Sequence, residues 1–201
     1  MKYTVMPMLG PDQLPLEEHG GPWIAGGEVP LDVCFTTSSG ARRLLRFLPG
    51  LEGGNPMTGV VPFPGSSSHV LALSRGQVFR MREIDGEIEI EPQVAPFPVF
   101  HALEDAERDA IILFDHTNAQ SVGTIGSQPT WVSPRLSDGG FRDPVLVGDR
   151  ITGIGWSAAR ERELRFTISA ETGRLLESAE IRPRLAPRLR SLAVRFLRLP
   201  G

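Results

Sequence analysis

The 201-residue chain is 40% hydrophobic, enough to build a core of its own, which excludes disorder as the default expectation. No run of 18 apolar residues occurs, so a membrane-spanning helix is excluded, and Pro7 and Pro11 interrupt the apolar stretch that a signal peptide needs. The single cysteine, Cys34, cannot form an internal disulfide, and we expect it to be a small buried core residue. These features together predict a cytoplasmic protein.

Glycine and proline divide the chain into short segments. The 22 Gly and 18 Pro are spread between brief apolar runs, which is typical of turns between strands. Residues 1–30 are rich in both and show little periodicity, so we expect an N-terminal strap over the surface. Residues 31–181 are predicted to form the β domain of a single-domain chain spanning 1–201.

The strongest hairpin signal is Asp85-Gly86, because both residues tolerate the positive φ of a tight turn. Before it, residues 77–82 alternate apolar and polar side chains, and after it residues 87–91 alternate strictly between Glu and Ile. We expect the isoleucines on the core face. We expect three carboxylates on the solvent face, where they could bind a partner. They are Glu87, Glu89 and Glu91.

The next segments are a helix candidate and a series of strands. Residues 102–110 could form a helix or an acidic loop, and residues 111–114 form an apolar run suited to a buried strand. Further strands are expected at 131–136, 144–147, 151–156, 164–168 and 174–181, separated by glycine-containing turns. Trp131 and Trp156 each lie among β-formers beside a turn, so we predict that both are largely buried.

Residues 110–178 carry a block of motifs that resembles known proteins. The motifs are Trp131-Val132-Ser133-Pro134, Asp138-Gly139, Gly153-Ile154-Gly155-Trp156 and Thr172-Gly173. This block resembles the C-terminal part of a group of uncharacterised bacterial all-β proteins whose repeats look like isolated propeller blades. The resemblance implies a blade-like fold and no known activity.

Four residues are the candidates for a catalytic or metal site. A hydrolase or metal-dependent enzyme could be built around His69, His101, Asp115 and His116, since imidazole and carboxylate serve both as proton carriers and as ligands. Yet no H-x-H, H-E-x-x-H or G-x-S-x-G spacing occurs, and the serines before His69 read as a solvated loop. The sequence therefore predicts no metal and no cofactor.

The tail combines an apolar stripe with positive charge. Residues 1–120 hold 16 acidic and 8 basic residues (net −8), whereas residues 121–201 hold 8 acidic and 13 basic residues (net +5). Apolar residues at spacings of 4, 3, 4 and 3 predict a basic amphipathic helix over 185–199. Its stripe is expected to pack on the parent domain, or else on a partner. The arginines that flank the stripe, and could bind that partner, are Arg188, Arg195 and Arg198.

These observations favour an all-β fold of many short antiparallel strands, propeller-like or sandwich, with one C-terminal amphipathic helix. They favour a non-catalytic bacterial binding or accessory protein that acts through surface contacts with a protein partner, possibly a co-encoded one. The enzyme described above is the alternative. Nucleic acid and a membrane surface are disfavoured as partners, because no aromatic side chains are interleaved with the basic residues of the tail.

Overall fold

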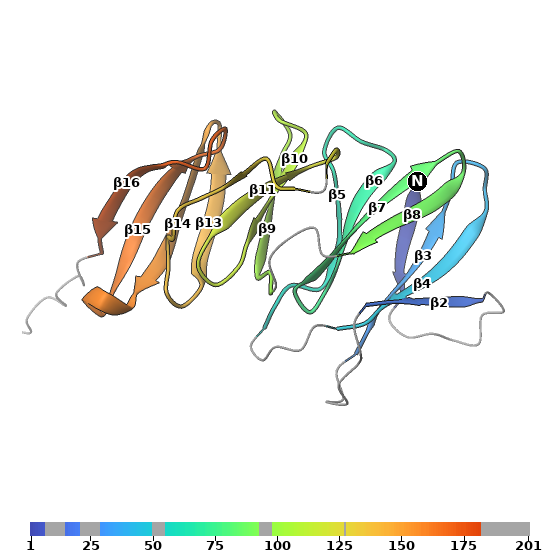
Figure 1. The fold of residues 1–201 in the computed structure, drawn as a ribbon, viewed down its shortest axis with the longest axis horizontal. Coiled ribbons are helices and arrows are strands. Elements are labelled where there is room, and N and C mark those ends of the chain that lie inside the picture. Colours follow the sequence, from blue (N-terminus) through green and yellow to red (C-terminus); the bar gives the residue numbers. More distant parts are fainter. Residues whose placement is uncertain (7–14, 21–28, 50–54, 93–97, 127, 182–201) are drawn as a thin grey trace, which may run out of the picture.

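Four small β-sheets stand face to face in a row along the long axis of the molecule (Figure 1). The computed structural model describes residues 1–6, 15–20, 29–49, 55–92, 98–126 and 128–181. These residues form sixteen strands, four to a sheet, and one 3-10 turn, Ala158–Arg160. The all-β prediction is therefore confirmed. The helix predicted over 185–199 lies outside the described residues.

Sheet A lies at the N-terminal end of the row and has the order β1-β3-β4-β2. Its strands are β1 (Lys2–Met6), β2 (Leu16–His19), β3 (Leu31–Thr36) and β4 (Arg42–Phe47). Strand β1 pairs antiparallel with β3, and β2 pairs parallel with β4. Two parts of the segment predicted as an irregular strap are thus edge strands. Cys34 on β3 is buried, as predicted.

Sheet B is an antiparallel meander with the order β5-β6-β7-β8. Its strands are β5 (Gly59–Pro62), β6 (His69–Ser74), β7 (Gln77–Ile84) and β8 (Glu87–Pro92). The predicted hairpin turn at Asp85-Gly86 joins β7 to β8, and both residues have positive φ, +52° and +82°. As the alternation predicts, Ile88 is buried and faces the core shared with sheet A.

Sheet C is a second meander, with the order β12-β11-β10-β9. Its strands are β9 (His101–Asp105), β10 (Ala110–Phe114), β11 (Ala119–Gly123) and β12 (Trp131–Val132). All five residues of β10 are buried, as the apolar run predicts. The helix considered for 102–110 is wrong. Residues 102–105 belong to β9 and pair with β10, and residues 106–109 form the turn between these two strands.

Sheet D closes the described part of the chain with a third meander, β13-β14-β15-β16. Its strands are β13 (Phe141–Val147), β14 (Arg150–Ser157), β15 (Arg162–Ser169) and β16 (Leu175–Glu180). Gly153 on β14 lies opposite Phe166, and a Cβ there would approach the phenyl ring to 2.6 Å. Glycine is therefore required at this position for the ring to reach the core.

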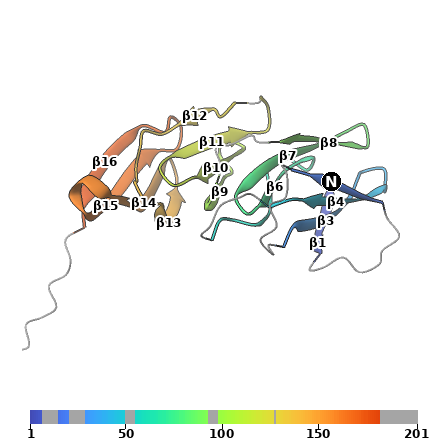
Figure 2. The ribbon, with the colours of Figure 1, turned by 60° about the horizontal axis from the view of Figure 1, so that its bottom comes forward.

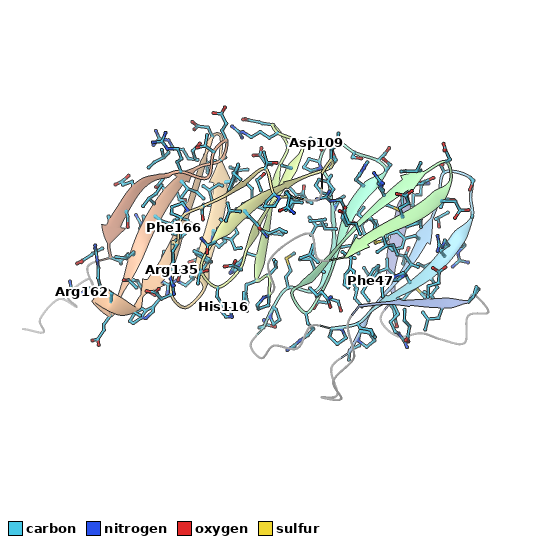
Figure 3. All side chains as sticks on the ribbon, viewed as in Figure 1. Phe47, Asp109, His116, Arg135, Arg162 and Phe166 are labelled. Atoms are coloured by element: carbon cyan, nitrogen blue, oxygen red, sulfur yellow. The ribbon has the colours of Figure 1, made fainter. Side chains whose placement is uncertain are left out.

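Three apolar cores hold the row together, one between each pair of neighbouring sheets. The core between A and B contains Phe47 and Phe79, whose ring centroids lie 4.9 Å apart. The core between B and C is aliphatic apart from Phe63, and the core between C and D contains Phe114, Trp131 and Phe166. Figure 3 shows Phe47 and Phe166 near opposite ends of this arrangement.

The row of sheets stays open, as the two views in Figures 1 and 2 show. Propeller blades also stack as four-stranded meanders, but in a propeller they return to the first blade and form a ring. Here sheets A and D stand at opposite ends. An open row leaves one face of each end sheet without a neighbouring sheet. No helix in the described residues is long and apolar enough to cross a membrane.

Candidate functional site

His69, the first candidate catalytic residue, begins β6 in sheet B. Its Nδ1 is hydrogen-bonded to the hydroxyls of Ser66 (2.9 Å) and Ser68 (3.1 Å), and its ring packs edge-on against Phe63. Burial lowers the pKa of His69, and the positive charges of Arg82 and Arg80 lower it further, against a weaker opposing effect of Asp109. The imidazole is therefore neutral at pH 7. Both hydroxyls share one nitrogen, so neither is arranged as a nucleophile with a base of its own.

Of the other three candidates, His101 begins β9 of sheet C, and Asp115 and His116 lie in the turn between β10 and β11. His101 Nε2–H donates to the carbonyl of Phe141 at 3.0 Å, and the ring of His116 packs against Phe100 in a tilted orientation with centroids 4.4 Å apart. Asp115 accepts hydrogen bonds from the backbone N–H groups of Thr117 (2.6 Å) and Asn118 (2.7 Å), so its carboxylate closes a turn.

The four candidates do not converge on one site. His69 belongs to sheet B, and each of the other three is engaged in separate local contacts. In the part of the chain that the structure describes, no group of three or more His, Cys, Asp or Glu side chains could hold a metal ion. Figure 3 shows His116 at the opposite edge of sheet C from Asp109, the acid whose charge acts on His69.

The three predicted partner-binding carboxylates all face arginines. Glu89 pairs with Arg82 at 2.6 Å, Glu91 with Arg80 at 3.5 Å, and Glu87 with Arg43 at 3.6 Å. Glu89 and Glu91 lie opposite these arginines on β7 and point to the side of sheet B that faces sheet C. Glu89 and Glu91 therefore line a polar cleft with about half of each side chain exposed, and Glu87, outside the cleft, is 82% exposed. The arginines predicted to bind a partner, Arg188, Arg195 and Arg198, lie outside the described residues.

This cleft has a volume of about 520 Å³ and lies between sheet B and the segment 124–126 that follows β11. Its walls are formed by His69, Arg80, Arg82, Glu89, Ile90, Glu91, Thr124, Ile125 and Gly126. Such a volume falls in the range of ligand pockets. The sequence does not predict it, because the alternation in 77–82 puts Arg80 on the polar face of its strand and does not show what covers that face. Arg80 is only 3% exposed, since the segment after β11 lies against it.

The second candidate surface is the open face of sheet D, which we define by Val145, Val147, Ile154 and Trp156. Phe141, Leu146, Ile151 and Phe166 point to the C–D core, and residues between them in the register point the other way. On that opposite face Val145 is 47% exposed, Val147 71% and Trp156 42%. In the register Val145 lies opposite Thr152 and Val147 opposite Arg150, whereas Ile154 and Trp156 lie further along β14, so these apolar side chains are spread along one face of sheet D.

The two tryptophans thus have different environments. Trp131 is buried, and its Nε1–H donates to the carbonyl of Ala170 at 2.9 Å, as expected of a packing anchor. The prediction that Trp156 is also buried is wrong. Trp156 follows Gly155 on β14 and therefore points to the opposite face, where it lies across from Glu163. No sheet of the described residues packs on that face.

Charged side chains lie among the apolar residues of the open face. Arg142 and Glu163 lie on the same face and form an ion pair at 2.8 Å. Arg142 and Arg165 lie opposite Ile154 on its two neighbouring strands, and the Arg165 side chain is exposed. Protein-binding surfaces combine apolar and charged side chains, and tryptophan and arginine are enriched among the residues that contribute most to binding.

Comparison with known proteins does not assign a family. No protein-family model matches the sequence, and a search of curated proteins finds no significant similarity. The resemblance of residues 110–178 to bacterial blade-like proteins stays a prediction.

Proposed function

We propose that this protein is a non-catalytic binding or accessory protein that acts through contacts with a protein partner, and that it docks this partner on the open face of sheet D. The observation that carries the proposal is the exposure of Val145, Val147 and Trp156 together on the last sheet of the row. Each of the three sheet-to-sheet contacts within the chain buries apolar side chains of the same kind. A partner would extend the same packing by one layer.

The chemistry of the face indicates the chemistry of the partner. Exposed apolar side chains lie along it, and Glu163 neutralises Arg142, one of the arginines between them. Arg165 adds an exposed positive charge beside Ile154. The matching partner surface presents apolar side chains to the valines and the tryptophan and places a carboxylate opposite Arg165.

The geometry of the histidines supports a binding role over the enzyme alternative. That alternative needs His69, His101, Asp115 and His116 in one cleft, and only His69 lines the cleft between sheets B and C. A general base must reach the proton that it removes, within about 3.2 Å or through one water. The separate hydrogen bonds of these residues give no such arrangement.

The proposal also includes the family relationship, the location and the source of the partner that the sequence predicts. Three consecutive four-stranded meanders support a relationship to bacterial propeller-blade proteins. We place the protein in the bacterial cytoplasm with a partner encoded beside it, as the sequence predicts.

Charge substitutions on the open face test this proposal. Val147→Glu and Trp156→Glu each place a carboxylate on the open face of sheet D in place of an exposed apolar side chain. Val132→Glu is the matched control, because this valine is 52% exposed and lies on β12 of sheet C, away from the open face. We expect both face variants to lose a protein that copurifies with the wild type and with Val132→Glu from the source cells. Binding should then be reconstituted with that purified protein.

Equal retention of this protein by all four forms would contradict the proposal. So would a wild-type dimer in sedimentation velocity that both face variants dissociate, because the occupant would then be a second copy.

A further inference from the structure

Arg80 is buried without enough partners. Its side chain is 3% exposed, and its Nη1–H donates to the carbonyl of Gly126, while Nη1 also lies 3.5 Å from the Glu91 carboxylate. Its Nε and Nη2 are buried and have no hydrogen-bond partner among the residues that the structure describes. A buried donor without a partner is costly, and more so when it carries charge, so such a group calls for a ligand.

The two unpartnered atoms form one edge of the guanidinium. Nε–H and Nη2–H point in parallel, in the arrangement that binds the two oxygens of a carboxylate or phosphate side by side. Arg80 also lines the cleft between sheets B and C, which has room for a small ligand. A charged donor pair of fixed geometry therefore lies beside a cavity of suitable size.

The segment 124–126 forms the movable wall of this cleft. The Gly126 carbonyl contacts Arg80, Ile125 is 88% exposed, and no atom lies within 4 Å of where a Gly126 Cβ would be. Few contacts thus hold this wall in place. Nε and Nη2 are buried, so a ligand must displace part of this wall to reach them, while the Gly126 carbonyl is bonded to Nη1 and does not occupy that edge.

Charge selects the class of ligand. Arg80 and Arg82 are balanced by Glu89 and Glu91 in the same cleft, and His69 is neutral. A doubly charged phosphate would meet two carboxylates, whereas a single carboxylate satisfies the one unpartnered edge. We propose that Arg80 binds the carboxylate of a small organic acid or of a peptide C-terminus in this cleft, at a site separate from the open face of sheet D.

The test is a titration monitored by NMR with acetate, N-acetylglycine, a short peptide with a free C-terminus and inorganic phosphate. We expect the carboxylates to shift the amide signals of 124–126 and to raise the pKa of His69, because a bound anion stabilises the imidazolium. The free-acid and peptide arms distinguish the two sources. Phosphate binding more tightly than every carboxylate would overturn the assignment.

Two variants separate binding from folding. Arg80→Lys keeps the charge but loses the paired donors, so we expect carboxylate affinity to fall about tenfold or more. Arg80→Met should abolish binding without lowering the melting temperature, since it removes unpartnered donors. Arg162→Met, at an exposed arginine of sheet D that pairs with Glu180, is the matched control and should bind as the wild type does.

Three results would overturn the inference: no shift with any carboxylate, unchanged affinity in Arg80→Lys, or a lowered melting temperature in Arg80→Met. The last result would make Arg80 a structural residue. None of the three bears on partner binding at the open face, so the two proposals fail separately.

Discussion

Replacing each of the two tryptophans with alanine should give very different losses of stability. Trp131→Ala removes a buried ring from the C–D core and the donor to the Ala170 carbonyl. Truncating a buried tryptophan costs about 3–5 kcal/mol through lost transfer energy and the cavity left behind. The lost hydrogen bond adds about 1 kcal/mol, so we expect about 4–6 kcal/mol in total.

Trp156→Ala leaves no closed cavity, because solvent already reaches 42% of the residue. Its remaining contacts include the backbone near Gly139, where a Cβ would lie 3.5 Å from Cδ1 of the ring. At about 25 cal/mol per Å² for the apolar area still buried, the loss should be about 1–2 kcal/mol. The difference between the two variants is therefore about 3 kcal/mol.

Urea unfolding followed by circular dichroism measures both losses, and an unchanged m-value shows that the same surface is exposed in each variant. The reasoning would be refuted by losses within about 1 kcal/mol of each other. A large loss for Trp156→Ala would mean that its face is covered in the folded monomer.

Three further predictions follow from local geometry. Gly173→Ala should lower the melting temperature more than Gly140→Ala does. Both glycines have positive φ (+68° and +87°), but only at Gly173 would a Cβ meet the ring of Trp131, at 2.4 Å. Thermal melts of the two variants test this. His69 should titrate below 6.5 in NMR, so its contribution to stability is complete above pH 6.5 and declines as the pH falls towards the folded pKa, because the unfolded state binds the proton more readily. Arg82→Gln should raise the pKa of His69, because it removes one of the two positive charges that lower it; an unchanged pKa would contradict the placement of Arg82 beside the imidazole.

Local pattern predicted those elements whose partners are close in sequence. The Glu-Ile alternation of 87–91 and the Asp85-Gly86 turn predicted the β7–β8 hairpin, because alternation and turn chemistry are properties of a few adjacent residues. Strand β2 could not be found in this way. It pairs in parallel with β4, with partner residues such as Leu16 and Leu44 lying 28 positions apart, and its own four residues show no alternation of burial.

Burial on a second face could not be predicted, because it depends on which sheet covers which. Arg80 and Trp156 each alternate with core residues and would face solvent in an isolated sheet. The segment after β11 lies against Arg80, whereas no sheet of the described residues packs on the face of sheet D that carries Trp156. For the same reason the histidines could not be grouped or separated from their spacing, since their distances are set by how sheets B and C stack.

Site-specific photo-crosslinking in the source cells tests partner docking on the open face most directly. A photoreactive phenylalanine analogue replaces Trp156 in one form and Asp85, at the distant β7–β8 turn, in the control. We predict that the probe at position 156 crosslinks to one other protein and that the probe at position 85 does not. A probe at position 156 that reacts only within its own chain at 185–199, only with a second copy, or with nothing would contradict the account.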